Sequence, residues 1–342
     1  MLTKYPNSPE RADALNGVKE VFTSNGDAQG YVNFVKSVPN INISDATQDS
    51  VAYLAAEANY SKGNCSQAIS EFGNYLKSFP QGAFALHAHF YRAECLFKSS
   101  DYNAALSDYE FVADQSPSRF SAKAMLQAAR INYNPKKDYG KAFTYYQQVS
   151  NNAELKADAL EAAKGMMYCA YNLQRNQEVT DAANRILSLT NAAAEDQTEA
   201  HFYLGRVAFA TNDFDKAFTE FSVVSKASSG AAGAEAAYRI AEIYFSRNQL
   251  KQTEEQCWYV VKSKSSQDYW IAKSYLLMAD VFTAQGDLFQ AKATLQSIID
   301  NYKGSDDIIP AANKKLEEVK AKEAEKSKLL PDEQKEDSDE SN

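Results

Sequence analysis

The stretch AISEF at residues 68–72, followed by Pro80, returns as ALSDY at residues 105–109, followed by Pro117. In both copies an alanine precedes an aromatic residue by four positions and a proline by twelve. A repeat of about 37 residues is typical of an array in which each unit buries its apolar face against its neighbours. The same register returns at Ala142 and Tyr146, at Ala217 and Phe221, and at Ala291 and Leu295.

Each repeat has the pattern of two helices joined by a short turn. Residues 50–62 supply a first helix (helix A) rich in alanine, and Gly63-Asn64 supplies the turn. Residues 67–78 place apolar side chains at spacings of three and four, which is one stripe of an amphipathic second helix (helix B). The pattern predicts an all-α fold, an α-solenoid of about eight antiparallel helix hairpins stacked with a right-handed twist.

The domain organisation follows from where this pattern starts and stops. Because Met1 to Pro9 has the composition of a hairpin end and a loop, we expect further repeats upstream of Met1. The hairpin at 157–189 fits least well, since its second helix could be in register at Thr180 or at Ala182. We expect a hairpin at 1–40, an array of about seven hairpins at 41–306, a capping helix at 307–328 and a disordered acidic tail at 329–342.

Composition and charge exclude several classes of protein. The formal net charge is −9, and residues 331–342 alone hold six acids against one lysine, which argues against a basic nucleic-acid surface. No run of 18 apolar residues is present, so we expect no membrane span in this chain. The first residues carry no signal-peptide pattern, but this does not report a compartment if repeats precede Met1.

Chemistry-bearing residues are sparse. Cys65, Cys95, Cys169 and Cys257 lie far apart without metal-ligand spacing, so we expect small buried hydrophobes and no disulfide framework. His87 and His89 are two apart on a helix and point in different directions, so they cannot share a metal. None of the phosphate-binding, zinc or nucleophile-elbow motifs occurs. We therefore predict no catalytic residues, no metal site, no cofactor and no enzymatic activity.

Aromatic residues recur seven apart in helix A and form the candidate binding site. Seven residues are two helical turns, so the members of a pair share a face, and stacked repeats would align them. One interpretation is an exposed aromatic ladder in the concave groove, and the other is packing between neighbouring A helices, which we favour for the second member of each pair. The pairs are Tyr53 and Tyr60, Phe90 and Phe97, Phe202 and Phe209, and Tyr238 and Phe245.

A charged residue stands one turn after the first aromatic residue of each of the four pairs, and Asp280 occupies the equivalent position in a further repeat. Four of these five residues are acidic, which favours a neutral or basic partner. The candidate binding residues on the concave face are therefore Tyr53, Glu57, Phe90, Glu94, Phe202, Arg206, Tyr238 and Glu242, with Asp280 completing the charged column.

These offsets resemble the tetratricopeptide repeat (TPR) family over about residues 9–303. The family pattern has a small residue in helix A, a Gly-Asp or Gly-Asn turn, and an alanine, an aromatic and a proline in and after helix B. Thr253 replaces the alanine in one repeat, and residues 134–138 lengthen one turn. The small residues are Ala56, Ala93, Gly205, Ala241 and Ala279, each twelve before its helix B position.

The resemblance implies a non-enzymatic scaffold that binds a protein or peptide along its concave face. The stretches YLKSFPQG at 75–82 and IIDNY at 298–302 further resemble envelope TPR proteins of Gram-negative bacteria. That likeness implies a periplasmic or outer-membrane-associated protein, with a role in envelope assembly. Two other functions remain open: a module that stacks glycans or cell-wall polymers on the aromatic ladder, and self-assembly through residues 1–40. A carboxylate clamp of the kind found in TPR adaptors is not indicated, because the matching sites are acidic and aromatic.

Overall fold

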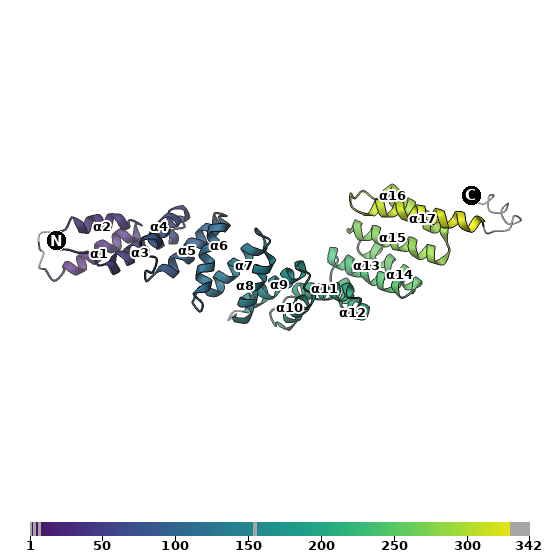
Figure 1. Cartoon of the computed structure of the whole chain (residues 1–342), viewed down its shortest axis with the longest axis horizontal. Coiled ribbons are helices and arrows are strands. Elements are labelled where there is room, and N and C mark those ends of the chain that lie inside the picture. Colours follow the sequence, from purple (N-terminus) through teal and green to yellow (C-terminus); the bar gives the residue numbers. More distant parts are fainter. Residues whose placement is uncertain (1, 3–4, 6–7, 153–155, 329–342) are drawn as a thin grey trace. The chain divides into compact units, whose positions relative to one another are not determined.

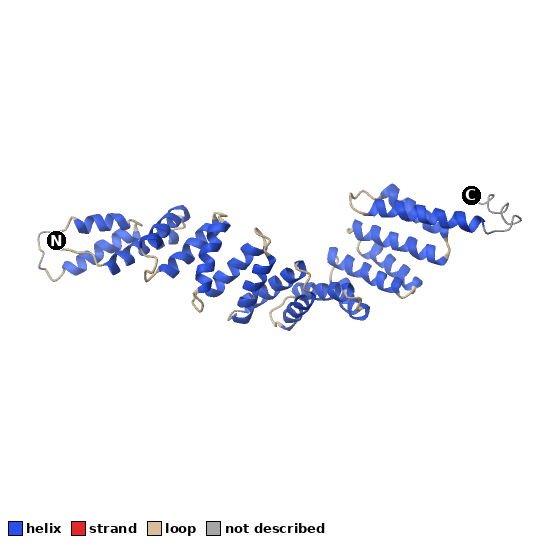
Figure 2. Ribbon diagram, viewed as in Figure 1, coloured by secondary structure: helices blue, strands red, loops and turns tan. Residues whose placement is uncertain are grey.

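The computed structural model describes residues 2, 5, 8–152 and 156–328, and they form 17 α-helices joined by short loops. Within these ranges there is no β-strand (Figures 1 and 2). The chain divides into two compact units, Met1–Gln174 and Arg175–Asn342, which are described separately. The predicted all-α fold of repeated helix pairs is confirmed.

Unit 1 contains four A–B hairpins and one further A helix. Consecutive helices pack against each other from α3 to α9, and α1 and α2 both pack on α3. Odd-numbered helices are A helices and even-numbered ones are B helices. The helices are α1 Arg11–Ser24, α2 Ala28–Lys36, α3 Asp45–Ser61, α4 Cys65–Ser78, α5 Ala85–Lys98, α6 Tyr102–Asp114, α7 Ser121–Tyr133, α8 Tyr139–Asn152 and α9 Lys156–Asn172.

Unit 2 begins with a B helix and ends with the capping helix α17. Ala182 in α10 is buried, whereas Thr180 is half-buried, so the register of this helix follows Ala182. The helices are α10 Asn176–Ser188, α11 Ala194–Ala210, α12 Phe214–Ala227, α13 Ala231–Ser246, α14 Leu250–Ser263, α15 Asp268–Gln285, α16 Leu288–Asn301 and α17 Ile308–Lys328.

The turn inside each hairpin has a recurring chemistry. The residue before the N-cap of helix B adopts the left-handed backbone conformation that glycine and asparagine tolerate best, as Gly286 (φ 82°) and Asn212 (φ 61°) do. The N-cap aspartate then accepts a hydrogen bond from the backbone three residues on, at 3.0 Å between Asp287 Oδ1 and Gln290 N. The same cap occurs at Asp27, Asp101 and Asp213.

The small residue predicted in helix A lies where helix B crosses it. A Cβ atom built on Gly205 would stand 2.7 Å from the ring of Phe221, so only glycine fits against this aromatic residue. The other four small residues have almost no solvent exposure, as expected for a close crossing: Ala56 0%, Ala93 0%, Ala241 0% and Ala279 1%. The aromatic residue four after the helix B alanine fills the core, as Phe72 and Tyr109 also do at 0% exposure.

The A helices of successive hairpins touch each other. In unit 1, α1 contacts α3, α3 contacts α5, and α7 contacts α9, whereas no comparable contact joins successive B helices. The A helices of unit 2 behave in the same way, because α13 contacts both α11 and α15. Within each unit the stack is therefore tighter on its A side, and we call that side the A-helix face.

Helix α17 packs on the last hairpin of unit 2. Its buried residues Ile308, Ala312, Leu316 and Val319 pack in one cluster with residues of α15 and α16. Its other positions are mainly lysine, glutamate and alanine, so a helix with a polar outer face covers the apolar side of the α15–α16 hairpin. The predicted disordered tail, 329–342, lies outside the described residues, and so does part of the expected N-terminal loop.

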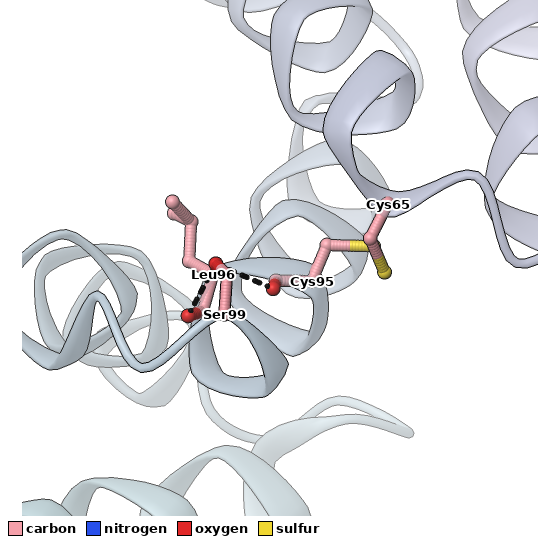
Figure 3. Close-up of a disulfide and its surroundings, with 4 residues drawn as sticks. All are labelled: Cys65, Cys95, Leu96 and Ser99. Atoms are coloured by element: carbon pink, nitrogen blue, oxygen red, sulfur yellow. Dashed lines mark hydrogen bonds between the residues drawn. A yellow bond between two sulfur atoms is a disulfide. The ribbon is translucent and has the colours of Figure 1, made fainter.

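The cysteines differ in part from the prediction. Cys169 and Cys257 are free and buried, as expected. Cys65 and Cys95, however, form a disulfide with their Cα atoms 5.1 Å apart (Figure 3). The prediction of no disulfide was wrong because these cysteines are 30 residues apart and meet only when one hairpin stacks on the next.

No helix in the described ranges is both long and apolar enough to cross a lipid bilayer.

The crossing at Gly205 gives a direct test of the repeat register. Gly205→Ala should lower the free energy of unfolding by about 1–3 kcal/mol, because the new methyl group overlaps the Phe221 ring. Gly17→Ala is the matched control, since Gly17 lies inside α1 with nothing within 4 Å of the added Cβ. This control should gain about 0.5–1 kcal/mol from helix propensity. Urea unfolding followed by circular dichroism measures both, and a Gly205→Ala chain as stable as the parent would contradict the crossing.

Candidate functional site

The four aromatic residues predicted to line an exposed ladder are buried. The exposed fractions are 3% for Tyr53, 4% for Phe90, 8% for Phe202 and 7% for Tyr238. The ladder as an exposed contact surface is therefore incorrect. The second aromatic residue of each pair is half-buried instead. These residues are Tyr60, Phe97, Phe209 and Phe245.

These rings join neighbouring hairpins. Tyr53 on α3 stacks on Phe84, with centroids 4.4 Å apart and planes 8° from parallel. Phe90 on α5 stacks in the same way on Phe120, at 4.4 Å and 19°. Phe84 and Phe120 are the N-caps of the next A helices, α5 and α7. Packing between A helices, the alternative interpretation of the pattern, thus explains the first member of each pair in unit 1.

Unit 2 uses its aromatic residues similarly. The ring centroid of Tyr238 on α13 lies 5.6 Å from that of Trp270, in the first turn of α15. Phe202 on α11 lies 6.4 Å from Phe221 of its own hairpin and is covered by the guanidinium of Arg206, 4.4 Å from the ring centroid. In both units the first aromatic residue of each pair belongs to a cluster of buried apolar residues.

The charged column is largely occupied by ion pairs between hairpins. Glu94 on α5 accepts hydrogen bonds from the ammonium of Lys123 on α7 and from the hydroxyl of Tyr109 on α6, both at 2.7 Å. Three repeats later the signs are reversed, because Arg206 pairs with Glu235 across the same separation of 29 residues. Asp280 pairs with Lys315 in the same manner.

The two remaining acids of the column are also held by their own chain. Glu57 accepts a hydrogen bond of 2.6 Å from the hydroxyl of Tyr53, and Glu242 accepts one of 2.7 Å from Arg239. The count of acids therefore says little about a partner's charge, since most of them are neutralised internally. Whether these eight residues take part in binding stays a prediction.

Burial fixes the protonation of the tyrosines beneath this surface. Burial, followed by the hydrogen bond to Glu57, raises the pKa of Tyr53 well above the ordinary range. Burial and the nearby Glu94 carboxylate raise the pKa of Tyr109 in the same way. Both hydroxyls are consequently neutral donors at any physiological pH, and each keeps its carboxylate oriented.

Four polar residues of unit 1 lie beside the stacked rings. We call this group the α3–α5–α7 face, and its members are Glu57, His87, Arg119 and Lys123. The His87 ring meets Phe120 edge-on at 5.0 Å and Tyr53 at 5.9 Å. Arg119 is exposed, and its guanidinium lies 4.5 Å from the Phe120 ring centroid. These residues hold a charged rim over a rigid aromatic base.

His87 is an unusual member of this face. Its Nδ1 atom is buried and makes no hydrogen bond with any described residue. Burial and the positive charge of Arg119 lower its pKa, against a smaller opposite effect of Glu57. The ring is therefore neutral at neutral pH.

The other two histidines are engaged in hydrogen bonds. His89 Nδ1 lies 2.6 Å from Asp108, which also accepts two hydrogen bonds of 2.7 Å from Arg92. At the equivalent place in unit 2, His201 Nδ1 lies 2.6 Å from Glu220. Among the described residues, no three His, Cys, Asp or Glu side chains are grouped so that they could hold a metal ion.

Two open grooves in unit 1 lie on the opposite side, between B helices. One of about 640 Å³ separates α2 from α4 and has Ala52 and Ala55 of α3 in its floor. The other, of about 510 Å³, separates α6 from α8 over Met125. Sequence patterns do not predict these grooves, because the grooves result from the distance between successive B helices in the stack.

The stacking role of Phe84 and Phe120 could have been predicted from the sequence, since both directly precede helix A in consecutive repeats.

The packing role of the rings can be tested with a matched pair in unit 2. Phe202→Ala should lower the free energy of unfolding by about 3–5 kcal/mol, because a buried ring is removed from the core. Phe289→Ala makes the same chemical change on α16, where the ring is 68% exposed, and should cost no more than about 0.5 kcal/mol. Denaturant titration of each variant is the measurement. Equal stability of the two variants would show that Phe202 is not a core residue.

Family models identify the repeats. Two tetratricopeptide repeat models match the chain, one at residues 53–120 and 170–232 and the other at residues 269–305. The comparison with curated protein sequences found no significant match.

Solved structures share the fold. The C-terminal part of a TPR repeat-containing protein from Cytophaga hutchinsonii is 15% identical, with a TM-score of 0.52 over 75% of this chain and 97% of that one. A signal transduction ATPase with a tetratricopeptide repeat sensor from Pyrococcus horikoshii is 11% identical, with a TM-score of 0.50 over 92% of this chain and 50% of that one. At these identities the likeness concerns the fold alone. The repeats matched by the family models and the helix pairs of the structure agree: the chain belongs to the tetratricopeptide repeat family.

Proposed function

We propose that this protein is a non-enzymatic scaffold that binds a polypeptide segment of another protein on the A-helix face of unit 1. TPR arrays typically offer such extended surfaces to protein partners. The observation that supports this site is the α3–α5–α7 face, where Arg119 and the His87 ring stand over a preformed aromatic base. A surface already ordered by its own core loses little entropy on binding.

The chemistry of this face suits a peptide that carries at least one carboxylate. Arg119 is exposed and makes no ion pair with the described residues, so its guanidinium can donate two parallel hydrogen bonds to the oxygens of a carboxylate. The half-buried His87 ring stands beside it, edge-on to Phe120. Binding of glycans on an aromatic ladder is not part of this proposal, because the ladder rings are buried.

The compartment is a separate proposal. We infer that the protein works in an oxidising compartment, in keeping with a periplasmic or outer-membrane-associated TPR protein of a Gram-negative cell and with a role in envelope assembly. The Cys65–Cys95 disulfide supports this, because disulfides persist outside the reducing cytosol. Fractionation of the source cells would test it, and recovery of the protein only from the cytosol would refute it.

Site-directed photo-crosslinking tests the binding surface. A photoreactive phenylalanine analogue at Ala122, exposed on α7 beside Arg119, should capture a protein in cells. The same analogue at Ser70, exposed on α4 beside the α2–α4 groove, should not. Adducts formed equally or preferentially at Ser70 would move the binding surface to the B side.

Arg119→Ala supplies the chemical test in the same cells. Removal of a central arginine anchor commonly costs 2 kcal/mol or more, so adduct yield at Ala122 should fall by about thirtyfold. Arg175→Ala, an exposed arginine at the start of unit 2, is the matched control and should leave the yield unchanged. Both variants should keep the parent melting temperature, and an unchanged yield with Arg119→Ala would exclude this residue from the site.

A further inference from the structure

The interface between the α3–α4 hairpin and helix α5 is fastened at two places. At the start of α5, Asp49 Oδ2 accepts a hydrogen bond of 2.8 Å from the backbone N–H of Ala83, and Tyr53 stacks on Phe84. Near the end of α5, Cys65 is bonded to Cys95. Eleven residues of helix separate Phe84 from Cys95, which is roughly 16 Å along the axis.

Among the interfaces between described residues, this one alone contains a disulfide. Cys65 is the first residue of α4, and the equivalent residue one repeat later is Tyr102 at the start of α6. Ile131 of α7, which corresponds to Cys95, belongs to a buried apolar cluster, and Tyr102 packs against that cluster. Apolar packing therefore does at the next interface what the disulfide does here. The two free cysteines, Cys169 and Cys257, lie elsewhere in the chain.

The surroundings of the two sulfurs decide how readily the bond exchanges. Cys95 has no solvent exposure and belongs to the cluster of Ala56, Phe72 and Ala88, whereas Cys65 is partly exposed. A reducing thiolate can approach only Cys65, and Cys95 would then have to leave as a thiolate inside an apolar cluster. Burial disfavours that charge, so the exchange is slow while the chain is folded.

We propose that the Cys65–Cys95 disulfide is a permanent structural staple that locks the α3–α4 hairpin onto α5 and so fixes the spacing of the A-helix face. Its formation removes two electrons and two protons from the two thiols and passes them to an oxidising disulfide, such as that of a thiol–disulfide oxidoreductase. With the bond absent, Asp49 and Phe84 still hold one end of α5, and the other end depends on the contact between Tyr60 and Tyr91, at 4.6 Å. This inference does not rest on the proposed function, because its readouts are thiol state and stability.

Thiol counting on the full chain is the first test. The protein is produced by export to an oxidising compartment, unfolded and treated with iodoacetamide before intact-mass and peptide analysis. Two alkylated cysteines, Cys169 and Cys257, and one linked peptide pair joining Cys65 to Cys95 are expected. Four alkylated cysteines, or a different linked pair, would overturn the proposal.

The second test measures what the staple does. Reduction of the parent chain by dithiothreitol should lower its urea midpoint and speed hydrogen exchange in residues 85–98. Cys65→Ala should already have the lower midpoint and should no longer respond to the reductant. The matched control is the double variant Cys169→Ala and Cys257→Ala, which should keep the full response. An unchanged midpoint on reduction of the parent chain, or a response lost in the control, would show that this bond is not the staple.

The rate of reduction separates a permanent staple from a redox switch. Dithiothreitol should reduce the folded chain at least about tenfold more slowly than the urea-unfolded chain, since Cys95 is a buried leaving group. Samples quenched with iodoacetamide over time give both rates. Equal rates in the folded and unfolded chains would overturn permanence and assign the pair to reversible exchange.

Discussion

The close crossing of helices A and B is the constraint on which every repeat depends. A small residue on helix A has to face a large residue on helix B, as Gly205 faces Phe221. If both positions were large, the helices would separate and the core between them would lose its contacts. If both were small, a cavity would remain. The pairing recurs along the chain, so each hairpin presents the same two faces to its neighbours, and stacking follows.

The contacts between hairpins are much more varied than those within them. One interface uses a disulfide, and the next uses an apolar cluster that includes Ile131 and is covered by Tyr102. The ion pair of Glu94 with Lys123 returns with reversed signs as Arg206 with Glu235. Any combination that is complementary satisfies an interface between neighbours. This freedom explains why residues at equivalent positions differ in charge while the fold is maintained.

The candidate binding surface of unit 1 is built on those same interfaces. Tyr53 and Phe90 are core residues, yet their stacking on Phe84 and Phe120 determines where His87 and Arg119 stand. The position of the polar rim therefore depends on the core packing beneath it. The aromatic base cannot change without loss of that packing.

The sequence by itself determined the helix pairs and the small-residue positions, because these depend on contacts within a repeat. Its spacing of Ala105, Tyr109 and Pro117 contains the geometry of one hairpin. Only the tertiary structure decided the disulfide, the burial of Tyr53 and Phe202, and the pairing of the charged column. Those features join residues about 30 positions apart, and a helical period tells which face a residue occupies but not which residue of the next hairpin it will meet.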